Sequence, residues 1–151
     1  MADAIGRLRE AGVVLNAPYY VALFADANLH HLRVDVAVAL LDEAEATIDE
    51  TTRTYFHRSE LARLRARAEF LLAGSDAFAR ARVELDRSLE LARAMGSPAL
   101  ALRTISDRLE LESVDGDPAP FRASLAELVA RYDGQDEPPD VVRARELLTR
   151  A

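Results

Sequence analysis

Apolar residues recur in this chain at intervals of three and four almost throughout, which is the spacing of one-sided helices. One stripe runs through Val36, Leu40, Ala44 and Ile48, and no segment alternates apolar and polar residues as a half-buried strand does. The same spacing returns in further stripes, which are Leu61, Leu64, Ala68, Leu71 and Leu72; Ala81, Leu85, Ser88, Leu89 and Ala92; Leu102, Ile105 and Leu109; Phe121, Leu125, Leu128, Val129 and Tyr132; and Val141, Ala144, Leu147 and Leu148. The spacing predicts an all-α fold.

Helix boundaries follow from capping residues and helix breakers. Ser97 and Asp117 each precede a proline, and a capping side chain before a proline is typical of a helix start. Gly96 and Gly134 can adopt the left-handed conformation that ends a helix. The predicted helices cover 2–11, 18–31, 35–51, 55–73, 76–95, 98–114, 118–133 and 139–150. Because the connections are short, successive helices must turn back on each other as antiparallel hairpins.

A pattern of small and large residues repeats in the second helix of each hairpin. The three occurrences are Ala37, Leu41 and Ala44; Ala81, Leu85 and Ser88; and Phe121, Leu125 and Leu128. Small residues let the two helices of a hairpin approach closely, and the leucine fills the groove between them. We therefore expect one repeat domain over 1–151, with a partial or capping helix at 1–17, hairpins at 18–52, 55–96 and 98–133, and a C-terminal capping helix at 138–151.

Several segments resemble a known family of helical repeats. They are Pro18-Tyr19-Tyr20, VALLDEA from 38 to 44, residues 60–65, LDRSLELARAMG from 85 to 96, residues 100–103, Pro139-Asp140 and residues 144–148. In these segments the chain resembles the C-terminal tetratricopeptide-like region of large bacterial signalling proteins, which join a regulatory ATPase, often with a nucleotide cyclase-like or DNA-binding domain, to a helical tail. The resemblance implies about three hairpins plus terminal helices, stacked as a short tetratricopeptide-like right-handed superhelix.

The resemblance carries two further expectations. It implies that the N-terminus lies within a longer array, which would leave an apolar end exposed, and we predict a concentration-dependent homodimer through that end.

Four positions depart from the family pattern. Leu32 stands where glycine is preferred and Asn28 where an aromatic residue is usual, while Asp107 and Glu112 replace apolar residues in the third hairpin.

Composition excludes several kinds of function. The chain has no cysteine, so neither a disulfide nor a thiolate metal site can form. It has no lysine and no glycine-rich loop of the nucleotide-binding kind. The formal charge of -7 disfavours nucleic acid as a partner, and no apolar run or leader indicates a membrane or secreted protein. We expect a cytoplasmic protein that needs no cofactor.

Histidines are the remaining candidates for chemistry. Asp26 and His30 stand four residues apart, as do His31 and Asp35, and this spacing can hold a metal ion. A stable site needs further ligands that the sequence does not indicate, so a structural role is favoured. A bundle that binds a metal or small molecule near His30 and His57 stays open as an alternative.

The first helix of each hairpin is expected to line a concave groove. Helical spacing places seven residues there, which are Tyr19, Asp26, His30, Arg65, Glu69, Arg103 and Asp107. An arginine in such a groove can hold a carboxylate through two hydrogen bonds. The leading hypothesis is a non-catalytic scaffold of bacterial signalling, which binds a protein or peptide partner, or its own upstream domains, through this groove. A structural homo-oligomerisation module is the other alternative.

Overall fold

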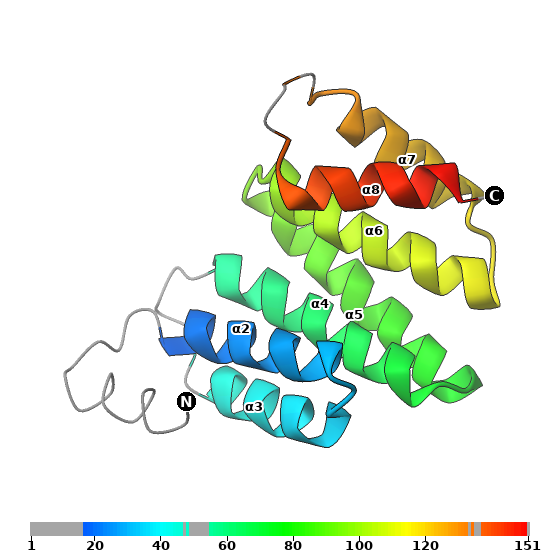
Figure 1. Ribbon diagram of the computed structural model, residues 1–151. Coiled ribbons are helices and arrows are strands. Elements are labelled where there is room, and N and C mark those ends of the chain that lie inside the picture. The colour runs from blue at the N-terminus through cyan, green and yellow to red at the C-terminus, as the bar shows by residue number, and fades with distance from the viewer. Residues whose placement is uncertain (1–16, 47, 49–54, 133, 135–136, 151) are drawn as a thin grey trace.

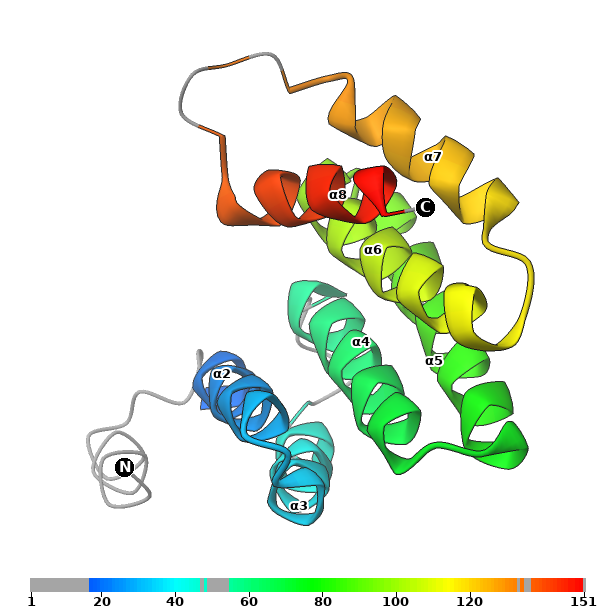
Figure 2. The same ribbon diagram turned by 45° about the vertical axis from the view of Figure 1, so that its right-hand side comes forward.

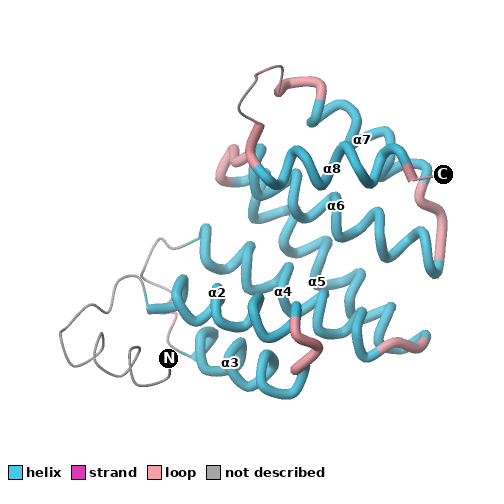
Figure 3. The backbone as a smooth tube through the Cα atoms, in the orientation of Figure 1, coloured by secondary structure: helices cyan, strands magenta, loops and turns pink. Residues whose placement is uncertain are grey.

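The computed structural model describes residues 17–46, 48, 55–132, 134 and 137–150, and these residues form seven helices and no strand (Figures 1 and 3). The helices are α2 (Ala17–His30), α3 (Val34–Ala46), α4 (Tyr55–Leu72), α5 (Ser75–Ala94), α6 (Pro98–Asp115), α7 (Ala119–Val129) and α8 (Pro139–Thr149). The all-α prediction is therefore confirmed. The predicted helix at 2–11 lies outside the described residues.

The predicted helix at 118–133 is longer than α7. This helix ends at Val129 rather than at residue 133, because the chain tightens there. The Arg131 amide donates to the Leu128 carbonyl at 3.2 Å and the Tyr132 amide donates to the Val129 carbonyl at 3.0 Å, and both bonds span three residues instead of four. The start of α6 agrees with the sequence, since the Leu100 amide donates to the capping hydroxyl of Ser97.

Each helix packs against its neighbour in the chain, and alternate helices also pack directly. The pairs α2 with α4, α4 with α6 and α6 with α8 are in contact, so these four helices lie in one row (Figures 1 and 2). Among the described residues, α3 makes no such contact with α5, nor does α5 with α7. One edge of the molecule is thus a continuous row of helices, while the other helices stand apart from each other.

The repeated small and large residues lie where the helices of a hairpin meet. Ala37, Leu41 and Ala44 are buried in an apolar cluster shared by α2, α3 and α4. In α5, Ala81 and Leu85 are buried in the same way. A second large cluster joins α6, α7 and α8, and there the middle residue of the pattern is fully buried while the two outer residues are half-buried.

Ser88, the third residue of the pattern in α5, joins three helices through hydroxyl groups. Ser59 Oγ on α4 donates to the Ser88 carbonyl at 3.0 Å. Thr104 Oγ1 on α6 donates to the Leu100 carbonyl at 2.9 Å, so its contact of 2.8 Å with Ser88 Oγ has Ser88 as the donor. All three hydroxyl-bearing residues are buried. The small side chain at position 88 therefore sets a close approach of α4, α5 and α6.

Left-handed residues end three of the helices. Gly96 has φ 61° and follows α5, where the Ser97 amide donates to the Ala92 carbonyl at 3.0 Å. Leu32 has φ 55° and follows α2 in the same way, with the Arg33 amide donating to the Asn28 carbonyl at 2.9 Å. Ala73 after α4 has φ 57°. The ends at Gly96 and Leu32 are of the Schellman type, and glycine is favoured at the left-handed position because a Cβ atom is strained there.

Candidate functional site: a charged face across alternate helices

Arg63 is the centre of a set of ion pairs between alternate helices. It lies on α4 with only 5% of its surface exposed. Its Nη1 donates to Asp107 Oδ2 on α6 at 2.6 Å, and its Nη2 donates to Glu60 Oε1, one turn earlier, at 2.6 Å. The same Nη2 lies 3.9 Å from Asp26 Oδ1 on α2. One buried guanidinium therefore contacts carboxylates from three helices of the row.

The ion pairs continue from α6 to α8. Asp107 Oδ1 accepts from Arg143 Nη2 at 2.6 Å, and the same nitrogen lies 2.8 Å from Glu110 Oε2. Nearby, Arg103 Nε donates to Asp140 Oδ2 at 2.6 Å. We call this set the alternate-helix network, and its members are Asp26, Glu60, Arg63, Arg67, Arg103, Asp107, Glu110, Asp140 and Arg143. It links α2, α4, α6 and α8 without a gap.

Asp107 stays ionised although it is buried. Burial raises the pKa of its carboxyl group, but the positive charges of Arg63, Arg143 and Arg67 outweigh burial and hold that pKa below its usual value. Burial likewise lowers the pKa of Arg63, while Asp107 and Glu60 raise it by more. A buried charge is costly unless it is paired and hydrogen-bonded, so each partner depends on the other.

Glu112 is the second acidic residue found at a position expected to be apolar. It is buried on α6, and its Oε1 accepts from Arg82 Nε on α5 at 3.0 Å and from Arg108 Nε at 2.7 Å. Burial raises the pKa of Glu112, but hydrogen bonds from these two arginines lower it by more. The Arg108 guanidinium also lies 4.8 Å from the centre of the Phe121 ring. Each of these two acids is thus paired with arginines, which lie on α4 and α8 for Asp107 and on α5 and α6 for Glu112.

The structure brings together most of the residues predicted to line the groove. Tyr19, Asp26 and Arg103 border one pocket of about 190 Å³ between α2, α4 and α6, which we call the groove pocket. Its other lining residues include Leu23, Glu60 and Leu100. His30 and Asp107 border a neighbouring pocket of about 240 Å³ at the far end of α2. Asp107 is only 5% exposed, so its carboxylate binds neighbouring arginines instead of facing solvent.

Arg65 and Glu69 do not lie on this face, which corrects the sequence interpretation. Arg65 Nη2 lies 2.7 Å from Asp42 Oδ1 and 3.1 Å from Glu45 Oε2, both on α3. Glu69 Oε2 accepts from Arg80 on α5 at 2.8 Å. The face of α4 that meets α2 and α6 carries residues 60, 63 and 67 instead, so the helical phase was assigned wrongly by about half a turn.

Arg63 does not stand out in the sequence, because arginine in a charged helix is usually a solvated residue. A signal was nevertheless present. Two acidic residues, Asp107 and Glu112, stood at positions where the repeat calls for apolar side chains. A buried acid requires a buried cation, so those positions pointed to arginines on the helices packed against them.

Histidine chemistry has little support in the part of the chain that the structure describes. His30 Nδ1 lies 2.9 Å from the Asp26 carbonyl oxygen and 3.8 Å from Asp26 Oδ1, and its side chain is 60% exposed. No group of three or more His, Asp or Glu side chains that could hold a metal ion occurs among the described residues.

None of the described helices combines the length and apolar character that crossing a bilayer requires.

Comparisons of this chain with protein-family models, with curated proteins and with solved structures give no match.

Proposed function

We propose that this chain is a tetratricopeptide-like repeat domain, with hairpins stacked in a right-handed superhelix, that binds a peptide segment of another protein or of its own upstream domains. The row formed by α2, α4, α6 and α8 supports this proposal, because in such repeats the first helices of successive hairpins line the binding face. The observation that carries it is the groove pocket, which opens on that row between α2, α4 and α6.

The groove pocket offers both apolar surface and hydrogen-bonding groups. On α2, Tyr19 is 36% exposed and Leu23 is 50% exposed, and both border the pocket. An apolar side chain of a bound peptide gains by removing this surface from water. Arg103 has five N–H donors, of which one binds Asp140, so further donors remain for a carboxylate or carbonyl of the peptide.

The network beneath the pocket gives the site a fixed shape. Asp26, Glu60 and Arg103 are each held by ion pairs to neighbouring helices, and they border the pocket from α2, α4 and α6. A pre-ordered face binds a peptide without first losing side-chain freedom. Because these polar groups are already held in ion pairs, the site is better suited to binding a partner than to catalysis. We propose a non-catalytic scaffold of a cytoplasmic bacterial signalling protein.

Peptide selection tests this proposal directly. A random phage-displayed peptide library is selected on the wild-type chain, and the peptides obtained are measured by fluorescence polarisation. We expect Leu23→Asp and Arg103→Glu each to weaken binding by about tenfold or more, since a hot-spot loss is about 2 kcal/mol. The matched control is Val83→Asp, which places the same charge on α5 at a residue that is 65% exposed.

Two results would contradict the proposal. In one, the peptides bind all three variants equally well. In the other, the Val83→Asp control weakens binding as much as the groove variants do. Far-UV circular dichroism melting curves of each variant show whether a loss of binding is instead a loss of folding.

A further inference from the structure

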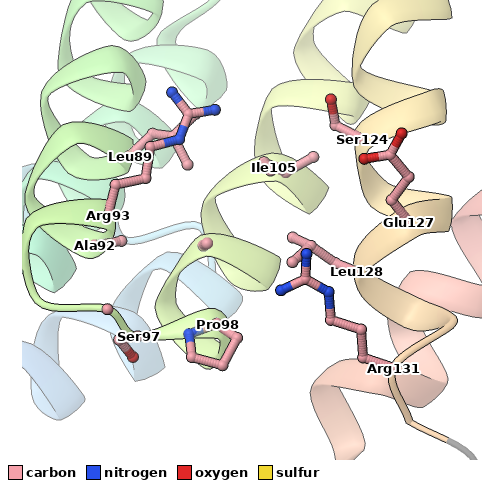
Figure 4. Close-up of a pocket in the computed structure, with 12 residues that line it drawn as sticks. Leu89, Ala92, Arg93, Ser97, Pro98, Ile105, Ser124, Glu127, Leu128 and Arg131 are labelled. Carbon is pink, nitrogen blue, oxygen red and sulfur yellow. The ribbon is translucent and has the colours of Figure 1, made fainter.

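A second pocket, separate from the groove pocket, opens between α5, α6 and α7 (Figure 4). Its volume is about 480 Å³. It exists because α5 and α7 both pack on α6 but, among the described residues, do not contact each other. We call it the α5–α7 cleft.

The floor of the α5–α7 cleft is apolar. Ala92, Ala101 and Ile105 form it, and each is at most 9% exposed. Leu89 on α5 and Leu128 on α7 are half-buried and border the two sides. A ligand in this cleft therefore needs an apolar body that can displace water from aliphatic side chains.

Two arginines reach into the cleft from opposite walls. Figure 4 shows the guanidinium groups of Arg93 and Arg131 directed toward the space between α5 and α7. Most arginines in the described part of the chain are joined to carboxylates, but neither of these two has an ion pair there. In a chain with a formal charge of -7, two cations without a carboxylate partner on one cleft indicate a site for an external anion.

The local charge balance of the cleft is positive. Among the described residues that border it, Glu127 is the one carboxylate that offsets the two arginines. The cleft also reaches Ser97 and Pro98 at the N-terminus of α6, where the helix dipole favours negative charge. Arg93, Arg131 and this helix end together outweigh the charge of Glu127.

We propose that the α5–α7 cleft binds a small amphipathic carboxylate, an organic acid whose apolar body rests on Ala101 and Ile105 while Arg93 and Arg131 hold its carboxylate. The volume of about 480 Å³ is within the range of small-molecule pockets, roughly 300–1,000 Å³. A helix with its side chains is about 10 Å across and needs more room than this. The site does not depend on the proposed peptide groove, which lies between α2, α4 and α6.

Methyl NMR of the full chain tests the site with a defined probe. Protein labelled at Ala, Ile and Leu methyl groups is titrated with octanoate, 1-octanol and octylammonium, which share an apolar body and differ in charge. We expect octanoate to cause saturable shifts at Ala101, Ile105 and Leu128. The alcohol is expected to bind more weakly, and the ammonium ion is expected not to bind there, because the arginines attract a carboxylate and repel a cation.

The Kd for octanoate of substituted chains shows what each charged residue of the cleft contributes to binding. Arg93→Ala and Arg131→Ala are each expected to raise the Kd for octanoate by about tenfold, the usual effect of losing a charge-assisted hydrogen bond. Glu127→Gln is expected to lower it. The matched control is Arg33→Ala, which removes an exposed arginine that does not border the cleft and leaves the Kd unchanged.

Four results would overturn the proposal. Octanoate could leave the cleft methyl groups unshifted, all three probes could bind alike, or both arginine variants could bind octanoate as the wild type does. An acidic peptide that shifts these methyl groups when octanoate does not would assign the cleft to a protein partner and would also overturn it.

Discussion

Arg63 Nη1 on α4 lies 2.6 Å from Asp107 Oδ2 on α6, and this buried pair joins residues 44 positions apart in the sequence. Asp107 accepts in turn from Arg143 on α8, and Arg63 approaches Asp26 on α2. Alternate helices are thus connected by charge as well as by apolar contact. The network bridges successive hairpins on the face where the groove pocket opens.

The pKa of Asp107 predicts a loss of stability in acid. Because that pKa is lowered in the folded chain, the carboxylate contributes stability that is fully present above about pH 4 and is lost as the pH falls through the folded pKa. We expect Asp107→Asn to be less stable than wild type at neutral pH and to lose less stability between about pH 6 and about pH 3. Urea unfolding at several pH values measures both effects.

A matched control for the pH experiment is Glu146→Gln, because Glu146 is exposed on α8 and its carboxylate has no ion pair among the described residues. This variant is expected to keep the pH profile of the wild type. If Asp107→Asn also kept that profile, the carboxylate of Asp107 would not be stabilised by its arginines, and the pKa assignment would be wrong.

Replacement of Leu32 by glycine is predicted to stabilise the fold. It adopts φ 55° with 72% of its surface exposed, so it bears the strain of a left-handed residue and buries little surface in return. Leu32→Gly is expected to raise the free energy of unfolding by about 1 kcal/mol. As a control, Val83→Gly changes another exposed aliphatic residue, one that lies in the interior of α5, and it is expected to lower stability. Thermal and urea unfolding give the sign of each change.

Replacement of Ser88 by a larger residue is predicted to destabilise the fold strongly. Its side chain is fully buried and lies within hydrogen-bond distance of hydroxyls on α4 and α6. Ser88→Ala is expected to cost about 1 kcal/mol through the lost hydrogen bonds. Ser88→Leu is expected to cost about 2 kcal/mol or more, because the larger side chain forces the three helices apart. Equal stability of both variants and the wild type would show that position 88 does not limit helix approach.

Periodicity and capping predicted seven helices of the described chain and the buried positions of the hairpins. Ala37, Leu41, Ala81 and Leu85 were identified because small and large apolar residues repeat at helical spacing, which is a local property of the sequence. Leu32 was noted only as a departure from the family pattern, which prefers glycine there, and its left-handed conformation was not predicted.

The charged face could be predicted only in part. Tyr19, Asp26 and Arg103 border one pocket, whereas Arg65 and Glu69 lie on another side of α4. In a helix rich in both arginine and alanine, such as α4, the polar residues do not define one face. Which side of α4 faces α2 and α6 is therefore set by residues of those helices, which are far away in the sequence. The α5–α7 cleft could not be predicted at all, because it arises from the separation of two helices.

A double-mutant cycle on Arg63 and Asp107 measures most directly whether alternate helices are held together by the network. Urea unfolding gives the free energies of the wild type, Arg63→Met, Asp107→Leu and the double variant. We predict that each single variant loses about 3 kcal/mol or more, since it removes one of the two close partners of a buried charge, and that the double variant loses at least about 2 kcal/mol less than the sum. Losses that add to within about 0.5 kcal/mol would contradict the account.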